Sequence, residues 1–176
     1  MKKSILVVVA SFMIVPASAQ MSVTTIGASD AAECFQHANN DWETSTTPCD
    51  IALRDGSTTR RDRKKTLVNR GIIHNRNGAL SFAFADFNAA LEIDDDLAEA
   101  YLNRGNSWFA SNNFDNALSD YEHALALDVA QPWAAWYNIG LVHDARKERD
   151  EARAAYMRAL ELKPDFTLAQ QKLENR

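Results

Sequence analysis

The sequence predicts an all-α protein whose helices form antiparallel pairs stacked into a solenoid. The first reason is a repeated spacing of three glycines, which lie 34 and 35 residues apart: Gly71, Gly105 and Gly140. The second is an aromatic residue sixteen positions after each glycine: Phe87, Tyr121 and Tyr156. The third is composition. Of 176 residues 46% are hydrophobic and only 6 are Gly and 4 are Pro, which is typical of a globular chain.

Charge and cysteine content exclude several classes of protein. The formal net charge of -5 argues against a general nucleic-acid binder, because such proteins need an excess of Lys and Arg to neutralise phosphates. The chain has 2 Cys, Cys34 and Cys49, which are too few for a disulfide-built fold or a four-cysteine zinc site.

Residues 1–19 predict a signal peptide. Two lysines precede an apolar run, and small residues end at Ala19, which is the order of regions in an export signal. We expect cleavage between Ala19 and Gln20. The alternative is a buried N-terminal helix or strand, although lysine pairs seldom open such elements. No second apolar stretch reaches the roughly 20 residues that cross a bilayer, so we expect a periplasmic or secreted chain without stable membrane insertion.

Residues 20–59 predict a degenerate helix pair ahead of the clear repeats. The segment that begins at Cys49 has the register of the segment that begins at Phe87, and Cys34 falls one position past the place of the repeat glycine. Those two positions face each other across a helix pair. Our hypothesis is a Cys34–Cys49 disulfide, which an oxidising compartment would permit. Two buried thiols and a catalytic dithiol are the alternatives, although the spacing is not Cys-x-x-Cys.

Residues 60–164 predict three repeats, at about 64–97, 98–131 and 133–166. In each first helix a large residue, the glycine and a second large residue lie at i, i+4 and i+7, and in each second helix Ala, the aromatic residue and Ala do the same. Each set forms one helix face. Glycine costs a helix interior about 1 kcal/mol relative to alanine, so we expect the aromatic ring of the second helix to pack over the glycine of the first.

This pattern resembles the tetratricopeptide repeat. The third repeat matches best, with the following residues: Trp136, Ile139, Gly140, His143, Ala152, Tyr156, Ala159 and Pro164. The chain departs from the family at His74 and His143, where the family favours Tyr. The resemblance covers about two-thirds of the chain. It implies a right-handed α-solenoid of antiparallel helix pairs, with three such repeats whose first helices line a concave groove.

Residues 165–176 predict a C-terminal capping helix after Pro164. Apolar residues lie on one side of it, and Gln, Lys and Glu lie elsewhere. A solenoid needs a terminal element with a polar outer face, and this segment suits that place.

The sequence contains no spacing typical of a catalytic, cofactor or metal site. It lacks a His-Glu-x-x-His motif, a phosphate loop, a dinucleotide fingerprint and Gly-x-Ser-x-Gly, and its 4 His are scattered. We therefore predict that the protein is not an enzyme and uses no cofactor and no metal.

The resemblance implies a peptide-binding groove. Asn69, Asn103 and Asn138 each lie two residues before the repeat glycine, about 200° round the helix from it. In the tetratricopeptide family this side of the first helix lines the groove, where Asn hydrogen-bonds the backbone of extended peptides. An amide suits this role because it supplies a donor and an acceptor. The alternative is that the three amides bond neighbouring helices or water. Arg76 is expected to add a basic charge to the groove. Further groove residues are expected to be Leu102, Asn106, Phe109, Tyr137 and Leu141.

We therefore expect an exported, non-catalytic scaffold or adaptor that binds an extended peptide or protein segment in the groove. The alternative is a structural subunit of a cell-envelope assembly that packs through its convex face. A small periplasmic hydrolase or metal protein ranks last. The identity of the protein partner, the pathway and the oligomeric state stay open.

Overall fold

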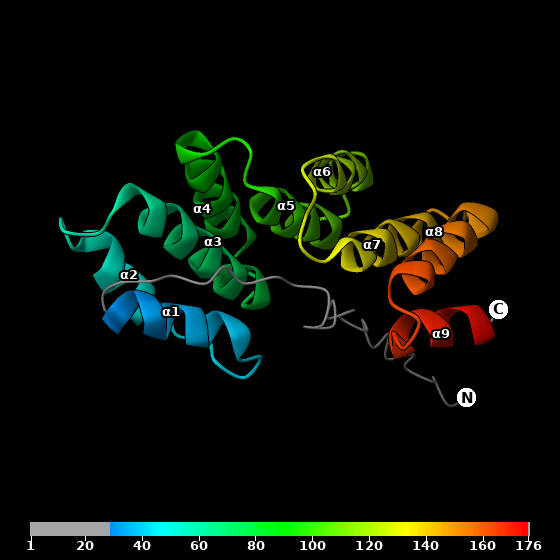
Figure 1. Ribbon diagram of the computed structural model, residues 1–176, viewed down its shortest axis with the longest axis horizontal. Coiled ribbons are helices and arrows are strands. Elements are labelled where there is room, and N and C mark those ends of the chain that lie inside the picture. The colour runs from blue at the N-terminus through cyan, green and yellow to red at the C-terminus, as the bar shows by residue number, and fades with distance from the viewer. Residues whose placement is uncertain (1–28, 176) are drawn as a thin grey trace, which may run out of the picture.

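The computed structural model describes residues 29–175, and every regular element in that part of the chain is an α-helix. The predicted signal peptide and its cleavage site after Ala19 lie outside the described residues. Figure 1 shows the helices following one another from α1 and α2 at one end to α8 and α9 at the other. The helices are α1 Ser29–Asn39, α2 Thr47–Arg54, α3 Arg60–Arg76, α4 Leu80–Ile93, α5 Ala98–Ala110, α6 Phe114–Ala126, α7 Pro132–Ala145, α8 Arg149–Leu162 and α9 Thr167–Glu174.

Three closely packed helix pairs confirm the predicted fold class: α3 with α4, α5 with α6 and α7 with α8. In each pair the aromatic ring of the second helix lies where a side chain on the glycine would be. A Cβ atom added to the glycine would lie only 2.6 Å, 2.6 Å and 2.5 Å from the nearest ring carbon. The three contacts are Gly71 with Phe87, Gly105 with Tyr121 and Gly140 with Tyr156. Real Cβ atoms do not approach so closely, so the glycines permit the helices to meet and the expected contact is confirmed.

The turns inside the three pairs share one left-handed residue. The backbone angle φ is +72° at Gly78, +58° at Asn112 and +65° at Lys147. Glycine adopts this region freely and Asn tolerates it, whereas a residue such as Lys is penalised there. The third turn therefore carries a strain that the first does not.

The predicted disulfide joins α1 to α2. Cys34 and Cys49 are bonded, with their Cα atoms 4.8 Å apart, and both residues are fully buried. This finding confirms the hypothesis and removes the two alternatives that required free thiols. The bond closes this helix pair, whereas an aromatic ring over a glycine closes each of the other three.

Two arginines connect successive helix pairs through contacts that no sequence pattern indicated. Arg70 donates from Nε and Nη2 to the two carboxylate oxygens of Asp86 in α4, at 2.9 Å and 2.6 Å. Its Nη1 donates to Asp50 in α2 at 2.7 Å. Arg104 repeats the arrangement with Asp120 in α6 at 2.8 Å and reaches α4 in place of α2. Each guanidinium therefore holds the second helix of its own pair and that of the preceding pair, and these bonds raise the pKa of both arginines.

α9 covers the C-terminal end of the stack, but it is short. It has 8 residues, whereas α3, α5 and α7 have 17, 13 and 14. Phe166 precedes it and packs its ring against those of Trp133 and Tyr137, with centroids 4.6 Å and 5.0 Å apart. Within residues 29–175, no helix combines the length and the apolar character that crossing a membrane requires.

Candidate functional site

The three asparagines predicted to line a groove are buried. Asn69 is 0% exposed, and Asn103 and Asn138 are 1% exposed. The Nδ2 of Asn103 donates to the carbonyl of Glu99 in its own helix at 2.8 Å. The amides therefore lie inside the packed structure and bond protein groups there.

Asn106 connects two first helices. Its Oδ1 accepts a hydrogen bond from Nδ2 of Asn138 in α7 at 2.8 Å and another from the hydroxyl of Tyr121 in α6 at 3.0 Å. The opposite atoms of the two amides, Asn106 Nδ2 and Asn138 Oδ1, have no hydrogen-bond partner within the part of the chain that the structure describes. We call four buried residues the amide seam: Asn69, Asn103, Asn106 and Asn138.

The expectation that these amides stand on an open groove wall is wrong. A position about 200° from the repeat glycine faces the first helix of a neighbouring pair, and α3 packs against α5 and α5 against α7. Leu102 is 0% exposed, Tyr137 3% and Leu141 9%, so this packing also covers most of the predicted apolar lining. Phe109 is half-buried and packs near Phe114, with ring centroids 5.8 Å apart.

Arg76 also departs from its predicted place in the groove. Its guanidinium donates to backbone carbonyls in the last turn of α1 and in the loop after it: His37 at 3.1 Å and Ala38 at 2.6 Å in α1, and Asn40 at 2.7 Å and Glu43 at 2.9 Å in the loop. No spacing in the sequence indicates this interaction, because the donor and its acceptors are more than thirty positions apart. Arg76 therefore supports a loop and does not supply a free charge.

A cleft lies at the C-terminal end of the stack, between α7, α8 and α9. It has a volume of about 730 Å³ and its lining is both polar and apolar. Arg149, Asp150 and Arg153 are exposed, so the first turns of α8 have an accessible side here. We call it the C-terminal cleft, and its lining residues are Tyr137, Asp144, Arg149, Asp150, Arg153, Leu168, Gln171, Lys172 and Asn175.

Charge in the C-terminal cleft is mixed, with three basic and two acidic side chains. Asp144 is engaged within the protein, because its Oδ2 accepts from the hydroxyl of Tyr156 at 2.6 Å and lies 3.6 Å from Nζ of Lys172. Partial burial lowers the pKa of Lys172, and burial raises that of Tyr156. Arg153 lines the cleft from α8 and is exposed.

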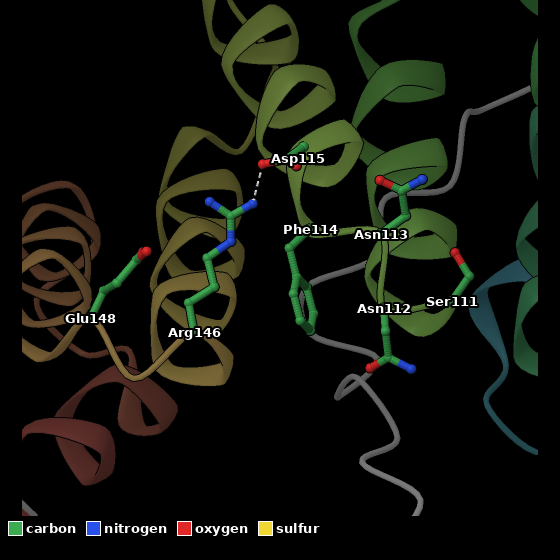
Figure 2. Close-up of a pocket in the computed structure, with 7 residues that line it drawn as sticks. All are labelled: Ser111, Asn112, Asn113, Phe114, Asp115, Arg146 and Glu148. Atoms are coloured by element: carbon green, nitrogen blue, oxygen red, sulfur yellow. Dashed lines mark hydrogen bonds and ion pairs between the residues drawn. The ribbon is translucent and has the colours of Figure 1, made fainter.

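A second hollow lies where the turn between α5 and α6 approaches the end of α7. Figure 2 shows that Arg146 points toward Asp115, with which it forms an ion pair, while Ser111, Asn112 and Asn113 point in different directions. These side chains do not converge on a common point. The hollow is therefore a weaker candidate than the C-terminal cleft.

Metal and catalytic groupings were not predicted from the sequence. Among the residues that the structure describes, no group of three or more His, Cys, Asp or Glu could hold a metal ion. The histidines lie apart: His143 contacts Glu148 at 2.6 Å, and His74 stacks on Phe82 with ring centroids 5.3 Å apart.

The family model described as "Tetratricopeptide repeat" matches residues 98–128 and 133–166 of the chain. Helices α5 to α8 of the chain therefore lie in stretches that match the tetratricopeptide repeat. These residues comprise α5 to α8, the two pairs that contribute Asn106 and most of the C-terminal cleft.

The curated proteins that this chain is similar to are much longer. Protein O-mannosyl-transferase TMTC1 of Mus musculus is 36% identical over 77 residues, which are 44% of this chain and 8% of that protein. Tetratricopeptide repeat protein 13 of Homo sapiens is 30% identical over 105 residues, which are 60% of this chain and 12% of that protein. The chain thus spans about a tenth of the length of these relatives.

Two solved structures share the fold. The first tetratricopeptide domain of Spaghetti (RPAP3), bound to the HSP90 peptide SRMEEVD, is 25% identical with a TM-score of 0.59, and the match covers 64% of this chain and 88% of that one. MamA is 24% identical with a TM-score of 0.63, and the match covers 82% of this chain and 80% of that one.

Proposed function

We propose that this protein is an exported, non-catalytic scaffold that binds an extended peptide or protein segment at the C-terminal cleft. The observation that carries the proposal is the cleft itself, which combines the half-buried side chain of Leu168 with accessible charged and amide groups. Binding sites of this kind use an apolar floor for affinity and a few polar groups for orientation. The amide seam is buried and takes no part.

The cleft suits a segment that carries an apolar residue next to an acidic one. The apolar residue would pack on Leu168, and the carboxylate would meet Arg153. Gln171 supplies an amide that can bond the peptide backbone through both a donor and an acceptor. The similar RPAP3 domain is seen with the acidic peptide SRMEEVD, which supports a ligand of this chemistry.

Export is part of the proposal. The predicted signal peptide directs the chain out of the cytoplasm, and the Cys34–Cys49 bond is of the type that forms and persists in oxidising compartments. We therefore propose a periplasmic or secreted location. Sequencing the N-terminus of the protein recovered from outside the cytoplasm tests this directly, and a chain that retains Met1 in the cytoplasm would contradict it.

A displayed library of random twelve-residue peptides tests the binding proposal. Selected peptides should share an acidic and an apolar residue, and Arg153→Glu should weaken their binding about tenfold through charge reversal. Arg158→Glu is the matched control, because Arg158 lies on the same helix, is 53% exposed and pairs with Glu161 outside the cleft. Fluorescence anisotropy gives the dissociation constants. Equal effects of the two variants, or a library without enrichment, would overturn the cleft proposal.

A structural subunit of an envelope assembly is the second candidate. Phe82 on α4 is 63% exposed and Met157 on α8 is 47% exposed, so two second helices carry apolar side chains that a permanent partner could cover. Under this reading Phe82→Ser with Met157→Ser removes the protein from its assembly in native gels and leaves peptide binding intact. Under the leading proposal Arg153→Glu is the damaging change.

A further inference from the structure

Trp42 is the most exposed large hydrophobic side chain in the described part of the chain. Its exposure is 92%, and it lies between α1 and α2 in residues 40–46, which we call the Trp42 loop. Trp is the residue most often found as an energetic anchor in protein interfaces. Its full exposure leaves the indole without a partner inside its own chain and available to another molecule.

Hydrogen bonds from the end of α3 hold the Trp42 loop in place. Arg76 donates to the backbone carbonyls of Asn40 at 2.7 Å and Glu43 at 2.9 Å, and Nδ2 of Asn77 donates to the carbonyl of Thr44 at 2.8 Å. These contacts come from the end of α3, so the loop is fixed to a repeat helix. A loop ordered before binding loses less conformational entropy on binding.

Two carboxylates flank the indole. Asp41 and Glu43 precede and follow Trp42 in the sequence. The backbone N–H of Ser45 donates to Oε1 of Glu43 at 2.9 Å, which lowers the pKa of that carboxyl, so Glu43 is ionised at neutral pH. The loop therefore presents an apolar anchor with negative charge on both sides.

The C-terminal cleft is complementary to this loop. It offers the apolar side chain of Leu168, and its exposed rim carries Arg149 and Arg153 against Asp150, while Asp144 and Lys172 pair with each other at 3.6 Å. The cleft has a volume of about 730 Å³, and an indole is the large apolar side chain that would fill part of it.

We propose that the Trp42 loop of one copy inserts into the C-terminal cleft of a second copy. The inference rests on the proposed function in one respect, since it names this loop as an occupant of the same cleft. Figure 1 shows α1 and α2 at the opposite end of the molecule from α8 and α9, so the contact is head-to-tail and generates a chain of copies. The contact is smaller than a standard interface of about 1,600 Å², so association is weak and rises with protein concentration.

Sedimentation of the purified protein over a range of concentrations tests the inference. Wild-type protein should exceed the mass of one chain at high concentration and low salt. Trp42→Ala should weaken association about 30-fold, as loss of an interface anchor does. Ile51→Ala is the matched control, because Ile51 lies on the adjacent helix α2 and is 45% exposed; this variant should associate like wild type.

Charge reversal identifies the two surfaces. Asp41→Lys alone and Arg153→Glu alone should each reduce self-association, and a mixture of the two variants should associate again, because each loop then meets an opposite charge. A mixture that stays monomeric, or unchanged association of Trp42→Ala, overturns the inference. If the loop binds a surface other than the cleft, Trp42→Ala should lose self-association, and the mixture of Asp41→Lys and Arg153→Glu should not recover it.

Failure of this inference is distinguishable from failure of the proposed function. Peptide binding is measured in Trp42→Ala, which should remain monomeric and bind the selected peptides at least as tightly as wild type. If the Trp42→Ala protein still loses peptide affinity on Arg153→Glu, the cleft binds peptides whether or not copies associate. If both readouts are unaffected by Arg153→Glu, both proposals fail.

Discussion

The amide seam and the C-terminal cleft differ in how far their polar side chains are exposed. In the seam, Asn103, Asn106 and Asn138 are at most 1% exposed, and Asn138 donates to Asn106 across two first helices. At the cleft, Arg153 on α8 and Gln171 on α9 are exposed and line an accessible space. Polar side chains therefore serve packing in the middle of the stack and are open to solvent at its end.

The largest loss of stability is expected from the removal of Tyr121, which hydrogen-bonds the amide seam. Its ring fills the space above Gly105, and its hydroxyl bonds Asn106 at 3.0 Å. Tyr121→Ala should lower the free energy of unfolding by about 4 kcal/mol, as large aromatic truncations do, whereas Tyr121→Phe should cost about 1 kcal/mol for the hydrogen bond. Urea unfolding followed by circular dichroism measures both. A loss below about 1 kcal/mol for Tyr121→Ala would mean that the ring does not hold the pair together.

The N-terminal pair differs from the repeats in being closed by a covalent bond. Cys34→Ala with Cys49→Ala should lower stability by about 3 kcal/mol, the amount expected for a loop of this length. Hydrogen exchange should become faster in α1 and α2 before α7 and α8. Peptide affinity at the C-terminal cleft should stay unchanged. Uniform acceleration along the whole chain would show that the bond supports the entire stack and not one pair.

The second repeat carries a buried ion pair where the third has apolar residues. Arg104 and Asp120 of the second repeat correspond to Ile139 and Ala155 of the third. Asp120→Ala should cost about 2 kcal/mol because it leaves a half-buried guanidinium without its carboxylate. Arg104→Ile combined with Asp120→Ala should recover more than half of that loss. Additive losses in the double-mutant cycle would contradict this account.

The smallest effect concerns the turns. Lys147 adopts φ of +65° where the first repeat has Gly78 at +72°. Lys147→Gly should raise stability by about 0.5–1 kcal/mol through relief of left-handed strain, and Gly78→Lys should lower it by a similar amount. Thermal unfolding compares the two. A destabilising Lys147→Gly would show that the lysine side chain contributes more than the strain removes.

Much of the fold could be predicted because it depends on local spacing. The distance from Gly71 to Phe87 specifies two helices and their contact, and the same register predicted the pairing of Cys34 with Cys49. Helical spacing also gives the direction in which Asn103 points. It does not give what lies in that direction, and the neighbouring first helix covers the amide.

The C-terminal cleft and the Arg76 interactions were missed for a related reason. Both depend on contacts between distant segments: Arg76 reaches carbonyls more than thirty positions away, and residues of three different helices line the cleft. The lining residue Tyr137 was predicted for the groove, but Arg153 and Lys172 had no spacing signal.

The most direct test measures the affinity of one selected peptide for wild type, Asn103→Ala and Arg153→Glu by fluorescence anisotropy, with folding verified for each protein. Binding through the end of the stack predicts a loss of about tenfold for Arg153→Glu and less than a twofold change for Asn103→Ala. Strong loss for Asn103→Ala with normal binding by Arg153→Glu would contradict the account and assign recognition to the amides.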